Sequence, residues 1–155
     1  MKLKLHHFYL ILATAAVVVS MFFPLIHFVY ADGAETMTNF SLIHLDGTAV
    51  HSPWALGALL IAVACVNVFT LFISLFRNFV LQKRCCIFSM LLTAGYYILF
   101  LLFTLIMKSG STSVQPAWTM VLPLVSIILA YMAFMAICHE EARIIAKANG
   151  FRLRD

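Results

Sequence analysis

WALGALLIAVACVNVFTLFISLF, the stretch from Trp54 to Phe76, contains no Asp, Glu, Lys or Arg. A hydrocarbon core about 30 Å thick is crossed by about 20 helical residues, so this stretch is long enough to span a bilayer. In lipid, every backbone N–H and C=O group must be paired within its own segment, which favours an α-helix. The sequence therefore predicts a membrane-spanning helix over residues 54–76.

Three further runs have the same apolar character and the same lack of charge: Phe8–Tyr30, Cys85–Met107 and Trp118–Cys138. The 155 residues are 64% hydrophobic and only 10% charged, whereas a soluble domain carries about 25% charged residues. We predict one all-α membrane domain over residues 1–155. Its four transmembrane helices, about 8–30, 54–76, 85–107 and 118–138, should form an up-down-up-down bundle. Pro24 and Pro123 fall inside the first and fourth helices and should kink them.

The first run also has features of a cleaved signal peptide. Lys2 and Lys4 precede it, and Val29-Tyr30-Ala31 offers a cleavage site. A signal peptide has an apolar core of about 7–15 residues, and this run is longer. We therefore expect a retained helix, with cleavage as the alternative.

The distribution of basic residues predicts the orientation of the bundle. Four spans place both ends on one side, and nine of the ten Lys and Arg residues fall on that side: Lys2, Lys4, Arg77, Lys83, Arg84, Arg143, Lys147, Arg152 and Arg154. The other side carries Lys108 alone. Because cytoplasmic loops of membrane proteins are enriched in Lys and Arg, both termini should be cytoplasmic in a multi-pass inner-membrane protein.

Two segments outside the spans have recognisable patterns. Asp46-Gly47 lies between two β-prone stretches and is a strong signal for a tight turn, so a small outer β-hairpin is expected over about 38–52, between the first two helices. In that hairpin, His44 would pair with Ala49 and His51 with Leu42. After the fourth span, a cytoplasmic helical tail is expected over 139–149, ending at Asn149-Gly150.

Small residues predict where the helices contact one another. Ser126, Ala130 and Ala133 share one face of the fourth helix, and Ala58 and Ala62 share one face of the second. In lipid, helices associate through close packing of small side chains and a few hydrogen bonds. These faces should be seams inside the bundle, with a face for another subunit as the alternative.

Polar residues within the spans are few. Asn67 and Thr70 lie near the middle of the second helix, with Ser74 one turn further. Interhelical hydrogen bonding is the expected role, and ligand contact is the alternative. His27 is the clearest titratable residue within a span, but a proton relay needs a carboxylate at the same depth and the sequence places none there.

Metal and catalytic sites receive little support. Cys85, Cys86, Cys138 and His139 fall near one boundary, but their spacing is not that of a zinc motif, so free cysteines are expected, as for Cys65. His44 and His51 in the hairpin lack a third ligand. Glu140 and Glu141 are adjacent and point to different helix faces, so salt bridges with Arg143 or Lys147 are expected. His6 and His7 have the position of membrane-interface residues. We predict no enzyme activity, cofactor or metal.

Two stretches resemble a known family. They are LFRNFVLQKRCC over Leu75–Cys86 and LPLVSIILAYMAFMAICHEEARIIAKANGFRLRD over Leu122–Asp155, together with FFPL over Phe22–Leu25. They resemble an uncharacterised bacterial family of small four-helix inner-membrane proteins, a domain of unknown function. In this resemblance, Glu140-Glu141 match an acidic pair after the fourth helix, and Arg152-Leu153-Arg154 match a signature near the end of the tail. The resemblance implies a topology and a bacterial setting but no activity.

Two classes of function are favoured over a third, an enzyme acting on lipid, which would need His, Asp or Glu clustered at one interface, whereas the sequence shows only scattered ones. The first is an accessory or scaffold subunit of an inner-membrane complex, bound to another membrane protein or to itself within the lipid bilayer. The second is a small transporter or channel, which would need a polar cavity around Asn67 and Thr70 or a pore in a homo-oligomer. Nucleic-acid binding is not expected, because the basic residues flank apolar runs and form no stripe on a polar domain.

Overall fold

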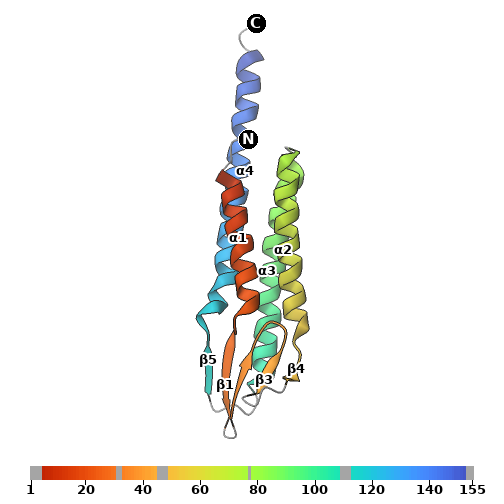
Figure 1. The fold of residues 1–155 in the computed structure, drawn as a ribbon. Helices are drawn as coiled ribbons and strands as arrows, with labels where there is room; N and C mark the ends of the chain where they lie inside the picture. Colours follow the sequence, from red (N-terminus) through yellow and green to blue (C-terminus); the bar gives the residue numbers. More distant parts are fainter. Residues whose placement is uncertain (1–4, 31–32, 45–48, 77, 109–112, 153–155) are drawn as a thin grey trace.

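Four long α-helices run side by side through most of the molecule (Figure 1). The computed structural model describes residues 5–30, 33–44, 49–76, 78–108 and 113–152. The helices are α1 (Leu5–Phe22), α2 (Trp54–Leu75), α3 (Phe79–Met107) and α4 (Leu122–Arg152). Helices α1 and α3 each pack against both α2 and α4. All four are long and apolar enough to cross a membrane, so the prediction of four such helices is confirmed.

The two ends of the bundle differ in character. One end carries a small β-sheet, and we call it the sheet end. At the other end α1 begins, α2 gives way to α3, and α4 continues beyond its neighbours (Figure 1). We call this the tail end. The bundle is therefore capped by the sheet at one end, and α4 projects from the other.

Helix α1 is shorter than predicted, because it ends at Phe22 and not at residue 30. Pro24 explains the difference, since proline lacks a backbone N–H and disfavours helical conformation in the residue before it. The following residues, IHFVY, form strand β1 (Ile26–Tyr30). Pro24 thus ends the helix and does not kink it. His27, expected within a span, lies in this strand opposite Thr36 and Gln115.

The other helix boundaries also shift. Helix α3 begins at Phe79, ahead of the expected Cys85, because the Asn78 side chain accepts a hydrogen bond from the Leu81 N–H at 3.3 Å and caps the helix. Pro123 is the second residue of α4, where its missing N–H costs little, so the expected kink is absent there. A short 3₁₀ helix, η1 (Trp118–Val121), precedes α4. Asn149-Gly150 does not stop α4, which continues to Arg152.

The sheet end is larger than the predicted hairpin. Five antiparallel strands lie in the order β4-β3-β2-β1-β5. Besides β1 they are β2 (Gly33–Met37), β3 (Leu42–His44), β4 (Ala49–His51) and β5 (Ser113–Pro116). The β3–β4 pair confirms a hairpin within 38–52. However, β1 comes from the apolar run assigned to the first helix, and β5 comes from the loop before η1.

The register of that hairpin differs in part from the prediction. His51 pairs with Leu42 as expected, but Ala49 pairs with Ile43 and not with His44. The register shifts between these pairs, as at a β-bulge, and His44 lies opposite Glu35 of β2 instead. The turn residues Asp46 and Gly47 and the side chains of His44 and His51 lie outside the described residues.

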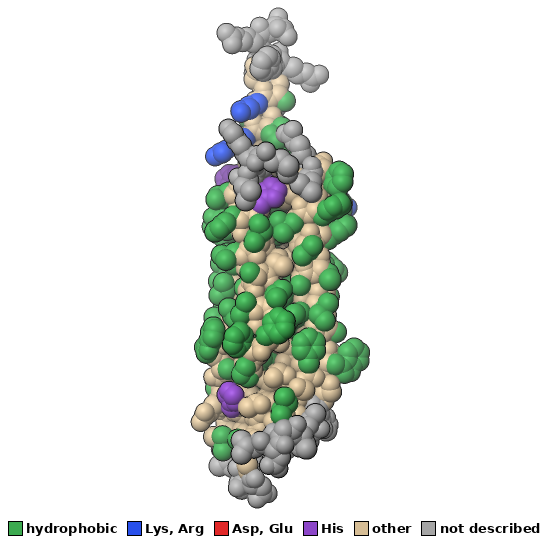
Figure 2. Space-filling model, in the orientation of Figure 1, with side chains coloured by type: hydrophobic (Ala, Val, Ile, Leu, Met, Phe, Trp, Pro, Cys, Tyr) green, Lys and Arg blue, Asp and Glu red, His purple; other side chains and the backbone are tan. Residues whose placement is uncertain are grey.

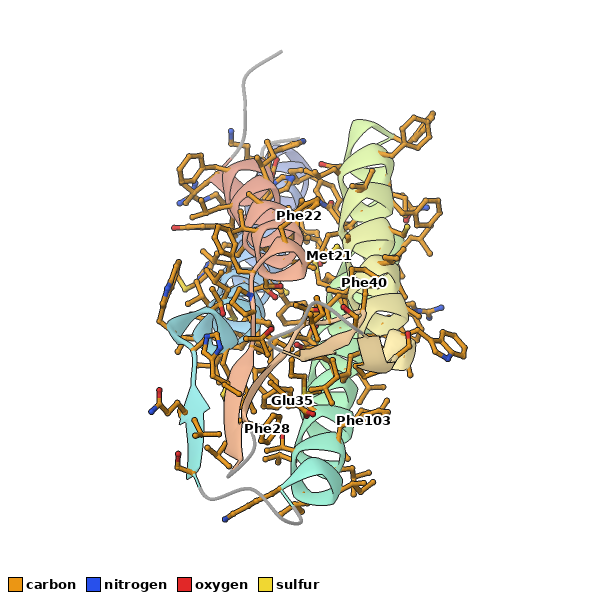
Figure 3. All side chains as sticks on the ribbon, turned by 60° about the horizontal axis from the view of Figure 1, so that its bottom comes forward. Met21, Phe22, Phe28, Glu35, Phe40 and Phe103 are labelled. Carbon is orange, nitrogen blue, oxygen red and sulfur yellow. The ribbon has the colours of Figure 1, made fainter. Side chains whose placement is uncertain are left out.

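The sheet is joined to the helices by an apolar cluster. Its buried members come from both: Val17, Leu25, Ile26, Phe28, Met37, Leu42, Leu56, Leu60, Val63, Tyr96 and Phe100. Figure 3 shows Phe28 of β1 directed toward α3, where Phe103 packs against the same cluster. Because a two-stranded hairpin is marginal alone in water, this support from the helices accounts for an ordered sheet.

Asn39 is a buried polar centre at this junction. It is fully buried, its Nδ2 donates to the Ser20 carbonyl at 2.7 Å, and its Oδ1 accepts from the Tyr96 hydroxyl at 2.9 Å. Its backbone carbonyl accepts from the Gly57 N–H at 3.0 Å. One loop residue therefore ties together the end of α1, the start of α2 and the middle of α3.

The outer surface of the helices is hydrophobic (Figure 2). Large apolar side chains such as Phe8, Phe72, Leu91 and Leu105 are more than half exposed, as expected of a surface solvated by lipid. Inside the bundle, α4 uses the predicted seam, since Ser126, Ala130 and Ala133 are at most 2% exposed. Helix α2 does not use its predicted seam, because Ala58 is exposed. The buried face of α2 carries Leu56, Leu60 and Val63 instead.

Candidate functional site

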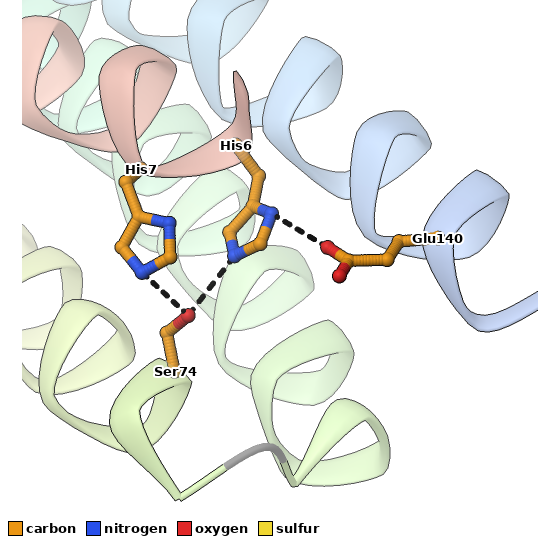
Figure 4. Close-up of polar contacts among 4 residues, drawn as sticks. All are labelled: His6, His7, Ser74 and Glu140. Atoms are coloured by element: carbon orange, nitrogen blue, oxygen red, sulfur yellow. Dashed lines mark hydrogen bonds and ion pairs between the residues drawn. The ribbon is translucent and has the colours of Figure 1, made fainter. Parts of the chain in front are cut away.

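Two histidines meet one serine at the tail end. Because α1 begins at Leu5, His6 and His7 lie in its first turn, and their rings stack with centroids 4.3 Å apart. The Nε2 atoms of both rings lie 2.9 Å from the Oγ of Ser74, in the last turn of α2 (Figure 4). A serine hydroxyl both donates and accepts, so it can bond to both rings at once.

Glu140 completes this group from a third helix. Its Oε2 lies 3.3 Å from the Nδ1 of His6 (Figure 4). His6 is only 2% exposed and Glu140 is 23% exposed. We call His6, His7, Ser74 and Glu140 the histidine cluster. It joins α1, α2 and α4 at the level where the first two of these helices begin and end.

The bonding capacities of the histidine cluster define one consistent arrangement of protons. With Glu140 ionised and His6 neutral, His6 donates from Nδ1 to Glu140 and accepts the Ser74 hydroxyl proton at Nε2. His7 then donates from Nε2 to the Ser74 oxygen. This leaves Nδ1 of His7 as a bare acceptor, which agrees with its lack of a partner among the described residues. The result is one directed chain from His7 through Ser74 and His6 to Glu140.

This chain has the connectivity of a serine nucleophile, a base and an acid, which the sequence did not reveal. Its surroundings differ from those of an acyl-transfer site. Ser74 lies one residue before the end of α2, so the negative end of the helix dipole is beside it. A negative dipole end disfavours an oxyanion, which needs N–H donors. The geometry suits a hydrogen-bonded link between the helices.

Glu141 makes a second link between helices. Its Oε2 lies 2.5 Å from the Nζ of Lys83 on α3, and both side chains are about one quarter exposed. The two adjacent glutamates therefore point to different helices, as predicted. The prediction that they pair with Arg143 or Lys147 was wrong. Glu140 instead pairs with His6 of α1, and Glu141 pairs with Lys83 of α3.

An open pocket of about 590 Å³ adjoins the histidine cluster. It lies between the first turn of α1 and the part of α4 that leaves the bundle. Its lining combines apolar, basic and acidic side chains: Leu5, His6, Ala136, His139, Glu140, Arg143, Ile144 and Lys147. We call it the tail pocket.

The polar residues of the mid-bundle act between or within helices. The Ser89 hydroxyl donates to Asn67 Oδ1 at 2.7 Å, which confirms that Asn67 bridges α2 and α3. Thr70 instead bonds to the Val66 carbonyl of its own helix at 2.7 Å. Nδ2 of Asn67 and Nε2 of Gln82 are buried and have no partner among the described residues. The hydrogen bonds of Asn67 and Thr70 therefore support helix packing.

Within the part of the chain that the structure describes, the metal-ligand candidates form no metal-binding group. The four cysteines are free, with Cys86 buried, Cys65 exposed, and Cys85 and Cys138 half-buried. Among the described residues, no group of three His, Cys, Asp or Glu side chains is arranged to hold a metal ion.

Sequence reasoning did not identify the histidine cluster, although a signal was present. His6 and His7 precede the first span and Glu140 follows the last, so the predicted topology already placed them at one depth. What the pattern could not show is which helices are neighbours. The contact of α1 with α4 is what brings His6 to Glu140.

Comparison with known protein families identifies one family model that matches the chain. The family model described as Domain of unknown function (DUF4293) matches residues 7–148. The chain belongs to the DUF4293 family. The matched range includes His7, Ser74 and Glu140, and it covers α1 from His7, all of α2 and α3, α4 up to Ala148, and the whole sheet. Among curated proteins, none matches the chain. The expected membership of an uncharacterised family is therefore confirmed.

Proposed function

We propose that this DUF4293 protein is an accessory subunit of a bacterial inner-membrane complex, with both termini in the cytoplasm, and that it binds its partner through the tail end. The observation that supports this role is the length of α4. The histidine cluster and the Lys83–Glu141 pair mark the level where the other three helices begin or end. Helix α4 continues from Glu140 to Arg152, about 18 Å further at 1.5 Å per residue.

The side chains of this projection are available for contact. All residues from Ala142 to Ala148 are exposed. They include Ile144 and Ile145, which form an apolar stripe with Ala148 beside the basic Arg143 and Lys147. An isolated helix of about twelve residues is marginal in water. A partner protein that covers the apolar stripe would stabilise it.

The interior of the bundle favours this role over transport through a single chain. Close packing of Ser126, Ala130 and Ala133 against the other helices leaves these side chains at most 2% exposed. Asn67 and Thr70, around which a polar cavity was considered, are 1% exposed or less and are hydrogen-bonded to protein groups.

The partner role predicts the effect of one substitution in the projection. Ile145→Asn should reduce recovery of the partner about tenfold in a mild-detergent pull-down of the tagged chain, read by mass spectrometry. Burial of one isoleucine contributes about 1.5–3 kcal/mol, and 1.4 kcal/mol is a factor of ten in affinity. Ala146→Asn is the matched control, because Ala146 is also exposed but lies outside the apolar stripe. Recovery of the chain alone, as a monomer or a homo-oligomer, would contradict the proposal.

The proposed orientation rests on the excess of Lys and Arg at the tail end. In a chain whose native cysteines are replaced by serine, Ser113→Cys on β5 should react with an impermeant maleimide in intact spheroplasts. Ala142→Cys on α4 should react only after lysis. Both positions are exposed, so access to the reagent depends on the side of the membrane. The opposite labelling pattern would overturn the orientation.

A further inference from the structure

The tail pocket has an excess of positive charge. Arg143 and Lys147 line it, and neither makes an ion pair within the described part of the chain. The one carboxylate in the lining, Glu140, already faces His6 at 3.3 Å. An anionic group is therefore the ligand that this lining favours.

The basic groups are arranged along one line. His139, Arg143 and Lys147 follow each other at intervals of four residues, so they lie on the same side of α4. Two such intervals span about 12 Å at 1.5 Å per residue. A single free phosphate is too small to contact all three, whereas a headgroup joined to a larger molecule is not. Figure 2 shows basic side chains on the projecting part of α4, above the hydrophobic surface of the bundle.

The remaining lining is apolar. Ala136 is one turn from Glu140 in the direction of the bundle and Leu5 belongs to α1, whereas Ile144 lies beyond Arg143 on the projecting part of α4. A pocket with Ala136 on its inner side and Arg143 and Lys147 further out matches a molecule that is hydrophobic at one end and anionic at the other. Its volume of about 590 Å³ is within the range of small-molecule sites.

We propose that the tail pocket binds the phosphate-bearing headgroup of an anionic phospholipid. Arg143 and Lys147 contact the phosphate and His139 lies beside it. Leu5 and Ala136 contact the glycerol and the upper acyl chains. The site shares Arg143, Ile144 and Lys147 with the proposed partner surface, but lipid binding needs only lipid and the chain itself, so it is tested without the partner.

The test measures lipid binding to the purified, delipidated full chain in neutral detergent. Phosphatidylglycerol, phosphatidylcholine and excess inorganic phosphate are compared by native mass spectrometry and by the shift in thermal stability. We expect phosphatidylglycerol to bind more tightly than phosphatidylcholine and inorganic phosphate not to displace it. Since one basic side chain near an anionic lipid surface contributes about a fivefold gain in affinity, Arg143→Gln/Lys147→Gln should weaken phosphatidylglycerol binding about thirtyfold.

Arg84→Gln is the control. Arg84 is an exposed basic residue of α3 that does not line the tail pocket, so its loss removes one positive charge outside the pocket and should leave lipid affinity unchanged. Helicity and elution volume of each variant report whether it is folded. Equal affinity for the two lipids, an equal loss in the Arg84 variant, or displacement by inorganic phosphate would each overturn the proposal.

Discussion

Replacement of Asn39 by leucine is expected to lower the free energy of unfolding by about 2–5 kcal/mol. The substitution keeps a side chain of similar length but removes both side-chain hydrogen bonds. It leaves the Ser20 carbonyl and the Tyr96 hydroxyl buried without a partner, at about 1–3 kcal/mol each. The measurement is equilibrium unfolding of the purified chain in mixed micelles.

Two further variants make that result specific to Asn39. Tyr96→Phe removes only one of the two bonds and should cost about 1 kcal/mol, since it leaves only the Asn39 oxygen without a donor. Gln115→Leu, at an exposed position of β5, should change stability by no more than about 0.5 kcal/mol. A loss below about 1 kcal/mol for Asn39→Leu would show that the junction tolerates separation of the sheet from the helices.

The second large effect is expected for His6→Ala, with a loss of about 2–4 kcal/mol. His6 is almost completely buried and is bonded to both Ser74 and Glu140. Its removal leaves a cavity between α1, α2 and α4 and takes a partner from a carboxylate that is mostly shielded from water. The same unfolding measurement reports the change.

His7→Ala is the neighbouring control. The His7 ring is half-buried and makes one hydrogen bond, so its removal should cost about 1 kcal/mol. His6→Ala should also loosen the first turn of α1, seen as faster amide hydrogen exchange there than in the centre of the helix. Equal effects of the two substitutions would mean that stacking of the rings, and not the link to Glu140, holds this end together.

The histidine cluster and the two proposals share a physical basis. Glu140 is bonded to α1 and Glu141 to α3, so α4 is held by its neighbours on both sides at the level where it leaves the bundle. A helix held in this way projects in a defined direction. That direction sets the shape of the tail pocket and presents Ile145 to a partner. We therefore regard the histidine cluster as a positioning element.

Much of the fold could be predicted from local sequence, but the sheet could not. Uncharged runs of the length of a bilayer predict helices because lipid leaves backbone groups no other partner. The same runs conceal β1, since IHFVY is as apolar as the helix before it, and only Pro24 marks the change. Strand β5 lies in a short loop with no alternation of its own. It forms because its register with β1, Val114 opposite Phe28, completes the sheet.

By itself the sequence determined the number of helices, the uneven distribution of basic residues, the hairpin before α2 and the Asn67 bridge. Each of these depends on a run of neighbouring residues or on one residue placed in lipid. Only the tertiary structure decided that His6 meets Ser74 and Glu140, and that Asn39 joins Ser20 to Tyr96. The physical reason is distance along the chain. Residues far apart in sequence meet only when the helices that carry them pack side by side. Which helices become neighbours depends on packing over the whole bundle.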